Sequence, residues 1–415
     1  MSTKKDVQIL RELARKYVEI CNKDIQKERR DLWRQHNSFI RTQIPIYVRA
    51  FAWKEMPEAI LKCEGPFFRS HENFLRQMIF QDTIGDDYIF EPWVTQKVSY
   101  VSEAEGIWGP KIGRTLSSEE RGSWKYDPPI KDLQDIDKMV MPHHIIDEKK
   151  TARNVARLEE AIGNILTVNV DRAPLYKIWN ADISTQLANL RGLEQIMWDM
   201  TDNPEWLNRL LSFMRDGILR AHQEAEDIGD WCLCDHYNQA MPYAEELPDP
   251  KANSKPVTRD KLWIFMAAQE FTLISPQMHE EFMLNYQLPI MEKFGLVSYG
   301  CCEDLTEKID MLRRIPNLRR IAVTPWADLQ RCVEQIQQDY IISWRPNPAD
   351  MVSRGFNPDH VRKVVKNAIE IAKGCYIDIT LKDVETVEND PNRVREWVRI
   401  VRDVCSSVVE NPTKK

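Results

Sequence analysis

The first forty residues carry apolar side chains at the spacing of a helix. Leu10, Leu13, Ala14 and Val18 recur three or four residues apart among many Lys, Arg and Glu side chains. This pattern predicts one long charged helix over about residues 5–40, which we treat as an N-terminal helical extension.

The next part of the chain mixes extended and helical patterns. Its alternating and β-branched runs predict strands or extended segments, and its periodic runs predict helices. The expected extended segments are Arg41–Phe51, Asp86–Tyr100 and Ile165–Val170, the expected helices are Ser70–Gln81 and Thr151–Gly163, and Gly106–Pro129 is expected to be irregular.

From residue 203 onward, strand and helix patterns alternate regularly. The expected helices are Asn203–Asp227, Pro276–Phe294, Leu305–Ile315, Asp328–Ile336, Pro358–Lys373 and Asn392–Val409, and the expected strands are Trp231–Cys234, Gly295–Cys301, Arg320–Val323, Tyr340–Trp344 and Gly374–Ile379. Repeated strand–helix units favour a parallel sheet covered on both faces. No Gly-rich phosphate loop is present, so the α/β pattern predicts a (β/α)8 TIM barrel, a single domain over residues 41–415.

Composition narrows the class of protein. The chain has 415 residues, 43% of them apolar, and a formal net charge of −7, which argues against nucleic acid as the main partner. No run approaches 18 apolar residues, and the polar amino terminus does not resemble a signal peptide. Nine scattered cysteines favour a reducing cytoplasm, where clustered thiols serve chemistry rather than disulfides.

The most informative segment is Gly295–Asp304, in which an apolar strand ends in two cysteines and two acids. The carboxyl ends of barrel strands carry the chemistry of this fold. Thiols and a carboxylate are ligands of a soft metal, so Cys301, Glu303 and the distant Cys375 are candidate ligands. Adjacent side chains of a strand point to opposite faces, so one of Cys301 and Cys302 is expected to pack in the core.

Other candidate residues follow from the same barrel geometry. Glu270 precedes a predicted helix and is a candidate ligand or general base, with a solvated loop acid as the alternative. His236 follows Cys232 and Cys234 and is expected at the mouth of the barrel, whereas His143-His144 is expected at the surface. Three tryptophans at predicted strand ends would wall an apolar pocket: Trp93, Trp326 and Trp344.

Residues from about Leu187 to Asp378 contain stretches that resemble a known superfamily. They include Leu190-Arg-Gly-Leu-Glu194, Asp202-Asn-Pro-Glu-Trp206 and Glu270-Phe-Thr-Leu-Ile-Ser-Pro276. With these stretches the chain resembles the uroporphyrinogen decarboxylase superfamily, and residues 1 to about 150 match it only loosely. The resemblance implies a (β/α)8 barrel. The arginine-rich N-terminal motif of the true decarboxylases is missing, because Ile44-Pro-Ile-Tyr-Val-Arg-Ala-Phe-Ala-Trp53 differs from it.

The resemblance is therefore greater to the cobalamin-linked methyltransferase branch, which holds zinc through a His-x-Cys motif and a distant cysteine. Tyr299-Gly-Cys301 occupies the His-x-Cys position, and Cys375 stands where the second cysteine is expected. Tyr299 replaces the histidine, so Glu303, Glu270 or His236 would complete the site. In this interpretation Cys301, Cys375 and Glu303 bind the metal, and Tyr299, Glu270 and His236 take part in catalysis.

The resemblance implies a zinc-dependent enzyme that moves a methyl group between a small methylated substrate and a corrinoid protein. The chain contains no cobalamin-binding module, so methylcobalamin would arrive on that separate protein. Two alternatives stay open: a metal-independent decarboxylase or lyase of the same superfamily, and a non-catalytic barrel that binds a cofactor. Neither a membrane nor nucleic acid is expected as a partner.

Overall fold

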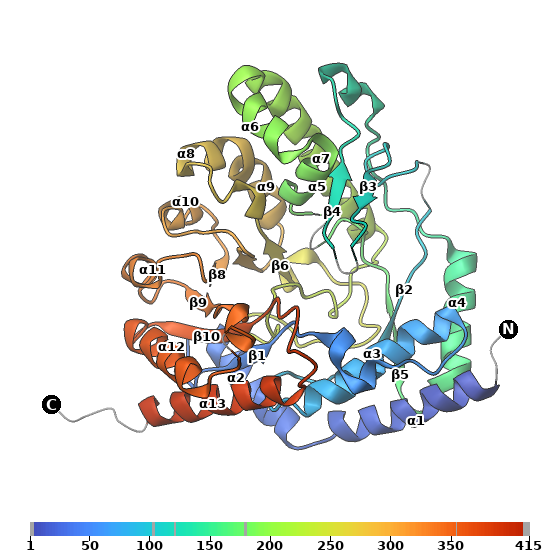
Figure 1. Ribbon diagram of the computed structural model, residues 1–415. Helices are drawn as coiled ribbons and strands as arrows, with labels where there is room; N and C mark the ends of the chain where they lie inside the picture. Colours follow the sequence, from blue (N-terminus) through green and yellow to red (C-terminus); the bar gives the residue numbers. More distant parts are fainter. Residues whose placement is uncertain (1–3, 102–103, 120–121, 178–180, 354, 410–415) are drawn as a thin grey trace.

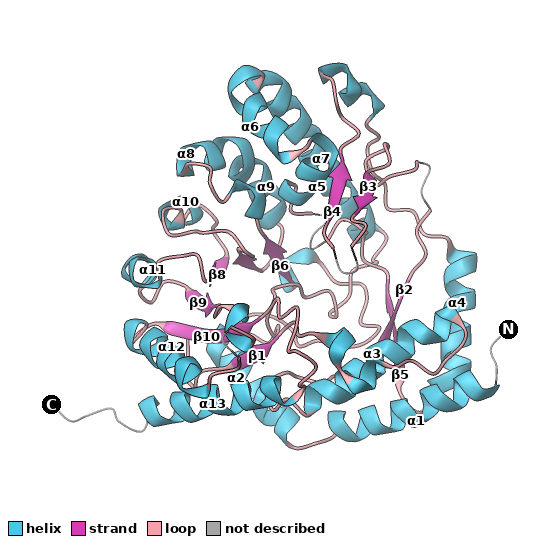
Figure 2. Ribbon diagram, viewed as in Figure 1, coloured by secondary structure: helices cyan, strands magenta, loops and turns pink. Residues whose placement is uncertain are grey.

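The computed structural model describes residues 4–101, 104–119, 122–177, 181–353 and 355–409. Its centre is a six-stranded sheet in the order β1-β10-β9-β8-β7-β6, in which every neighbouring pair is parallel. The sheet curls into a half-barrel with helices along its outer side (Figure 1, Figure 2). Its strands are β1 (Ile46–Val48), β6 (Trp263–Met266), β7 (Leu296–Tyr299), β8 (Leu318–Val323), β9 (Ile341–Trp344) and β10 (Tyr376–Leu381).

Four further strands form two small sheets. Strands β2 (Trp93–Lys97) and β5 (Thr167–Asp171) pair in parallel, and β3 (Gly113–Leu116) and β4 (Trp124–Asp127) form an antiparallel hairpin. In the described part of the chain neither pair is hydrogen-bonded into the main sheet. The α/β class and the parallel sheet are therefore confirmed, and closure into a full (β/α)8 barrel stays a prediction.

Most predicted helices are present with shifted ends. The helices are α1 (Lys4–Cys21), α2 (Ile25–Asn37), α3 (Pro66–Asp82), α4 (Glu148–Ile162), α5 (Ser184–Arg191), α6 (Leu193–Asp202), α7 (Pro204–Asp227), α8 (Pro276–His279), α9 (Asn285–Met291), α10 (Ile309–Leu312), α11 (Leu329–Ile336), α12 (Pro358–Ile371) and α13 (Asn392–Val409). A π-helical stretch, Glu280–Leu284, connects α8 to α9. None of the described helices has the length and apolar character needed to cross a membrane.

The structure differs from the predicted elements in four places, of which the first three are these. The N-terminal extension is two helices, because the chain breaks between Cys21 and Ile25 at residues with poor helix propensity. Strand β6 was missed. The segment Gly106–Pro129, expected to be irregular, contains the β3–β4 hairpin.

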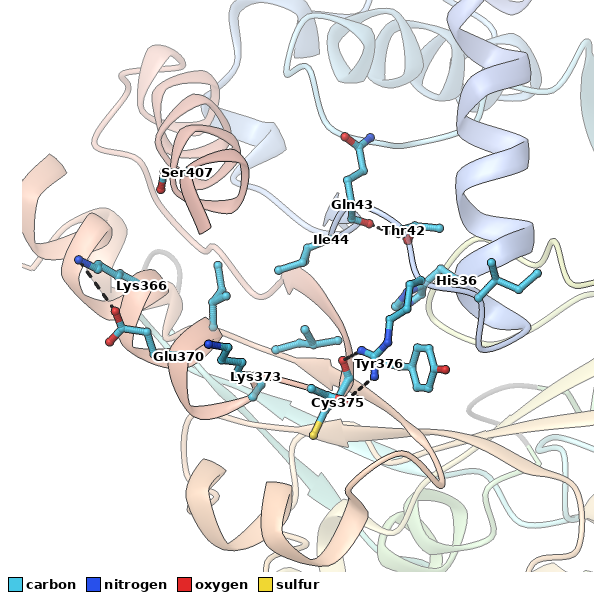
Figure 3. A pocket seen from close by; sticks show the side chains of 16 residues that line it. His36, Thr42, Gln43, Ile44, Lys366, Glu370, Lys373, Cys375, Tyr376 and Ser407 are labelled. Carbon is cyan, nitrogen blue, oxygen red and sulfur yellow. Dashed lines mark hydrogen bonds and ion pairs between the residues drawn. The ribbon is translucent and has the colours of Figure 1, made fainter. Parts of the chain in front are cut away.

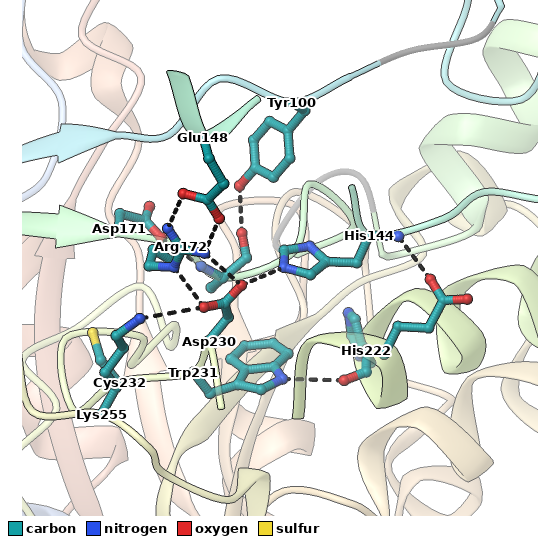
Figure 4. Close-up of polar contacts among 12 residues, drawn as sticks. Tyr100, His144, Glu148, Asp171, Arg172, His222, Asp230, Trp231, Cys232 and Lys255 are labelled. Atoms are coloured by element: carbon teal, nitrogen blue, oxygen red, sulfur yellow. Dashed lines mark hydrogen bonds and ion pairs between the residues drawn. The ribbon is translucent and has the colours of Figure 1, made fainter. Parts of the chain in front are cut away.

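The predicted strand Trp231–Cys234 is instead a turn, and the surrounding polar contacts explain this. The Cys232 amide donates to the Asp235 carboxylate at 2.8 Å, which closes the chain on itself rather than leaving it extended. Beside this turn Asp230 accepts from Arg172 and lies 3.0 Å from Nε2 of His144 (Figure 4). His144 is 7% exposed, so its predicted place at the surface was wrong.

Side chains of the sheet alternate between a helix-covered face and a concave face. In β10, Ile377 and Ile379 belong to the core under the helices, so Asp378 and Lys382 face the concave side. The concave face is therefore the polar one, and its carboxyl end is where parallel α/β sheets place their chemistry.

Candidate functional site

A cavity of about 230 Å³ opens at the carboxyl ends of β7, β8, β9 and β10. We call it the mouth cavity. Its lining combines two thiols, two cationic side chains and an apolar wall, contributed by Cys301, Cys302, Thr324, Pro325, Trp326, Arg345, Pro346, Asn347, Pro348, Lys382 and Asp383.

The two thiols lie side by side next to a buried ammonium group. The sulfur atoms of Cys301 and Cys302 are 3.4 Å apart, and Nζ of Lys382 lies 3.1 Å from the Cys302 sulfur and 3.5 Å from that of Cys301. The hydrogen bond from Cys301 and the charge of Lys382 lower the pKa of Cys302 to about 6, against the opposing effect of burial. The lowered pKa favours the thiolate of Cys302, and a thiolate is the reactive form of cysteine.

Gly300 directs this pair of thiols into the cavity. It has φ of +100°, a conformation that side chains with a Cβ rarely adopt, and an added Cβ would lie 2.8 Å from Cδ1 of Leu305. Glu303 then fixes the loop, because its carboxylate accepts from the amides of Ala268 at 2.9 Å and Cys301 at 2.7 Å. Both Glu303 oxygens are therefore used to hold the backbone, which leaves it poorly placed to be a metal ligand.

Tyr299 does not lie at the mouth. It is fully buried on the helix-covered face, where its hydroxyl donates to Gln287 of α9 at 3.0 Å and lies 3.0 Å from Nε2 of His279 in α8. Burial raises the pKa of Tyr299 well above its ordinary value. Because Gly300 interrupts the alternation of the strand, Tyr299 and Cys301 face opposite sides, contrary to the His-x-Cys interpretation.

Cys375 lies at the other end of the sheet. It precedes β10, and its carbonyl accepts from Nη1 of Arg41 at 2.6 Å in a separate cavity of about 800 Å³ that includes His36 (Figure 3). Burial raises the pKa of the Cys375 thiol. The prediction that its thiol faces the mouth was wrong because Cys375 lies at the amino end of β10, and the mouth lies at the carboxyl ends of the strands.

The register of the sheet decides whether Cys301 and Cys375 can share one zinc ion. The register pairs across β8 and β9 place Tyr299 of β7 and Ile377 of β10 at the same height along the strands. Cys301 lies two residues beyond that height toward the carboxyl end, and Cys375 lies two residues before it. At 3.3 Å per residue this separates them by roughly 13 Å along the strands alone. Two thiolates on one zinc ion are at most about 4.6 Å apart, so the predicted ligand set does not fit. In the described ranges no three His, Cys, Asp or Glu side chains group as a metal site.

The remaining candidates are dispersed. Glu270 accepts from Ser184 Oγ and, at 3.0 Å, from Thr185 Oγ1, so it holds the start of α5 rather than lining the mouth cavity. His236 lies at the amino end of β6, where its Nδ1 accepts from the Trp263 amide at 3.4 Å. Burial lowers the pKa of His236 to about 4, so the ring is neutral at neutral pH.

The three predicted pocket tryptophans lie in three different places. Trp326 lines the mouth cavity and is 73% exposed at its rim. Trp344 belongs to the core under the helices, and Trp93 lines a different cavity of about 190 Å³, which it shares with His236. The structure thus brings together Cys301, Cys302 and Trp326, with Glu303 as the support of their loop.

The interpretation of the sequence missed one cationic side chain of the mouth, Lys382. Lys382 was overlooked because the predicted last strand ended at Ile379, two residues too early. Arg345 follows β9 directly, and its Nη1 and Nη2 donate to the carbonyls of Cys301 and Gly300. The alternation of Ile377, Ile379 and Leu381 was the signal that would have extended the strand to Lys382.

Comparison with known proteins yields a likeness of fold alone. No family profile matches the chain, and no curated protein matches its sequence. Among solved structures, a methyltransferase from Methanosarcina mazei superposes with a TM-score of 0.50 at 12% sequence identity, covering 90% of this chain and 97% of that one. At this identity the likeness supports the α/β architecture over almost the whole chain.

Proposed function

We propose that this protein is a methyltransferase whose chemistry takes place in the mouth cavity. The observation that carries the proposal is the Cys302 sulfur, which lies 3.1 Å from Nζ of Lys382 at the carboxyl end of the sheet. Two considerations support methyl transfer as the reaction. The sequence resembles the methyltransferase branch of the uroporphyrinogen decarboxylase superfamily, and the fold resembles that of a methyltransferase. A full (β/α)8 barrel is part of the same proposal.

The proposed reaction has two displacements. The Cys302 thiolate attacks the methyl carbon of a small methylated substrate, the new C–S bond forms as the bond to the leaving heteroatom breaks, and that heteroatom departs with the electron pair. The methyl group then passes to an acceptor, and the electron pair of the C–S bond returns to Cys302. Lys382 favours this return because its charge stabilises the thiolate.

The acceptor in this proposal is a corrinoid carried by a separate protein, as the sequence resemblance implies. A corrinoid supplies a strongly nucleophilic cobalt centre to which a methyl group can be transferred. Trp326, exposed at the rim of the mouth cavity, offers an apolar surface on which such a carrier can dock transiently. Zinc takes no part in the proposed steps, because the predicted ligands do not converge.

The test follows the methyl group. The protein is mixed with a reduced corrinoid carrier and a panel of O-, N- and S-methylated compounds. Methylcobalamin is followed by absorbance, and the masses of tryptic peptides are measured by mass spectrometry. We expect methylcobalamin to form when the carrier is present. When the carrier is omitted, we expect the mass of the peptide containing Cys302 to increase by one methylene group. Cys302→Ser is expected to abolish both signals, whereas Cys375→Ser retains them.

Three other results would redirect the proposal. Methylcobalamin formation without modification of Cys302 would replace the two displacements by one direct transfer. Release of CO2 from an acid without methyl transfer would favour the decarboxylase. Ligand binding without turnover of any compound would favour a non-catalytic cofactor-binding protein.

A further inference from the structure

The concave carboxyl end of the sheet carries three cationic side chains on adjacent strands. Lys382 follows β10 and Arg345 follows β9, and both line the mouth cavity. Arg49 follows β1, and the register that pairs Val48 with Leu381 places it beside Lys382. The proximity of Arg49 is also electrostatic, because burial first and the charge of Arg49 next lower the pKa of Arg345.

Arg345 has hydrogen-bonding capacity that its surroundings leave unused. It is 1% exposed, yet its Nε finds no hydrogen-bond partner in the described part of the chain. Its terminal nitrogens donate to the carbonyls of Cys301 and Gly300 rather than to a carboxylate. A buried guanidinium without a directly paired anion is costly, so an anion in the cavity would stabilise it.

The acids of the mouth match these charges only in part. Asp383 lies 2.6 Å from Nζ of Lys382, but its side chain is 49% exposed, and solvent weakens such a pair. The carboxylate of Glu303 accepts from two backbone amides and makes no hydrogen bond to Arg345, although its charge opposes the lowering of the Arg345 pKa. Among the described residues, Arg345 therefore has no carboxylate as a direct hydrogen-bond partner, and it lines the same cavity as Lys382 and Cys302.

We infer that the substrate of this site carries an anionic group, a carboxylate or sulfonate, which binds Arg345 and Lys382 while its methyl group faces Cys302. The inference rests on the proposed function and specifies the class of methyl donor. The cavity volume of about 230 Å³ lies below the range of roughly 300–1,000 Å³ typical of sites for drug-sized ligands. Pro325, Trp326 and Pro346 form an apolar wall for the body of a small molecule.

The experiment measures protection of Cys302 from alkylation, a readout that does not depend on methyl transfer. Iodoacetamide labelling of Cys302 is timed with and without methoxyacetate, methoxymethanesulfonate or the neutral isostere methoxyacetamide. We expect the two anions to slow labelling in a saturable manner at constant ionic strength, and the amide to be at least tenfold weaker. Equal protection by the amide, or no protection by either anion, would overturn the inference.

Variants identify the residues that bind the anion. Lys382→Gln is expected to weaken protection at least tenfold, and Lys382→Arg is expected to retain it. For each variant the labelling rate with anion is divided by the rate without anion, so that a change in the pKa of the thiol cancels. Lys373→Gln removes the same charge in the cavity at the other end of the sheet and serves as the matched control. Unchanged protection in Lys382→Gln, or equal loss in Lys373→Gln, would refute the assignment.

The two proposals can fail separately. Protection by anions without any methyl transfer would overturn the methyltransferase and leave the anion subsite in place. Methyl transfer from neutral donors, with no protection by anions, would overturn the subsite alone.

Discussion

A buried arginine lies at each end of the concave face, and the two differ in their hydrogen-bond partners. Near the amino end, Arg320 donates to Asp378 at 2.6 Å, and Nε2 of His36 lies 3.3 Å from the same carboxylate. At the carboxyl end, Arg345 is equally buried but faces carbonyls, thiols and another cation. Among the described residues Nε of neither arginine has a hydrogen-bond partner, but Arg320 is directly paired with a buried carboxylate, whereas Arg345 donates to backbone carbonyls.

The difference indicates that the amino end of the face contributes to stability and that the carboxyl end is the candidate site of chemistry. Burial raises the pKa of Asp378, but Arg320 and the hydrogen bond from His36 outweigh it and hold the pKa below its ordinary value. Such a matched pair closes the amino end of the face. A buried guanidinium that lacks a hydrogen-bonded carboxylate lowers stability, and such groups are concentrated at sites that bind substrates.

The largest expected effect comes from breaking the matched pair. Asp378→Asn leaves Arg320 charged and buried without its carboxylate, so we expect a loss of about 3–5 kcal/mol in the free energy of unfolding. Asp383→Asn, at the half-exposed pair of the mouth, is expected to cost less than about 1 kcal/mol. Urea unfolding of both variants measures the difference, and similar losses would contradict the contrast between the two ends.

The second prediction concerns the reactivity of the thiols. A thiolate reacts and a thiol does not, so the alkylation rate of Cys302 should rise with pH to a plateau, with half of the increase near pH 6. Cys301→Ala removes the largest stabilising hydrogen bond and should move that midpoint upward. At pH 7 the rate would then fall by up to roughly 30-fold if the pKa reaches the ordinary value of about 8.5.

Cys375 is the internal control for this profile. Its pKa is raised by burial, so it should label slowly across the same pH range. A midpoint for Cys302 near 8.5 in the unaltered protein would show that its neighbours do not activate it.

The third prediction separates Tyr299 from the chemistry. Tyr299→Phe leaves two buried polar partners unsatisfied, His279 and Gln287, and should cost about 1–3 kcal/mol of stability with little change in kcat. Tyr299→His should not increase the zinc content, because position 299 faces the helices. Elemental analysis and turnover by the same preparations test both statements, and a zinc-binding Tyr299→His would restore the His-x-Cys interpretation.

The smallest expected effect is that of Cys375→Ser. Its thiol lies at the amino end of β10, away from the mouth cavity, so the variant should change neither the metal content nor the alkylation profile of Cys302. Stability should change by less than about 1 kcal/mol. Loss of activity with an intact fold would require Cys375 to act at a distance that this geometry does not provide.

Much of the architecture follows from local pattern alone. The buried strands β7, β8, β9 and β10 and the helices between them were predicted with ends shifted by a few residues, because apolar β-branched runs and amphipathic periods are local signals. The segment Gly295–Asp304 was correctly singled out as lying at the carboxyl end of a strand. Strand β6 was missed, and the segment Trp231–Cys234, which has an apolar pattern like that of a strand, closes as a turn around the Asp235 carboxylate.

The amino-acid sequence by itself determined a parallel α/β fold and the placement of Cys301 and Cys302 at a strand end. Only the tertiary structure decided which side chains meet there. The positive φ of Gly300 separates Tyr299 from Cys301, and the parallel register of β10 places Cys375 at the amino end of the sheet and Lys382 at the carboxyl end. Strand register and backbone handedness depend on contacts between residues far apart in the chain, and a one-residue error in either moves a side chain to the opposite face.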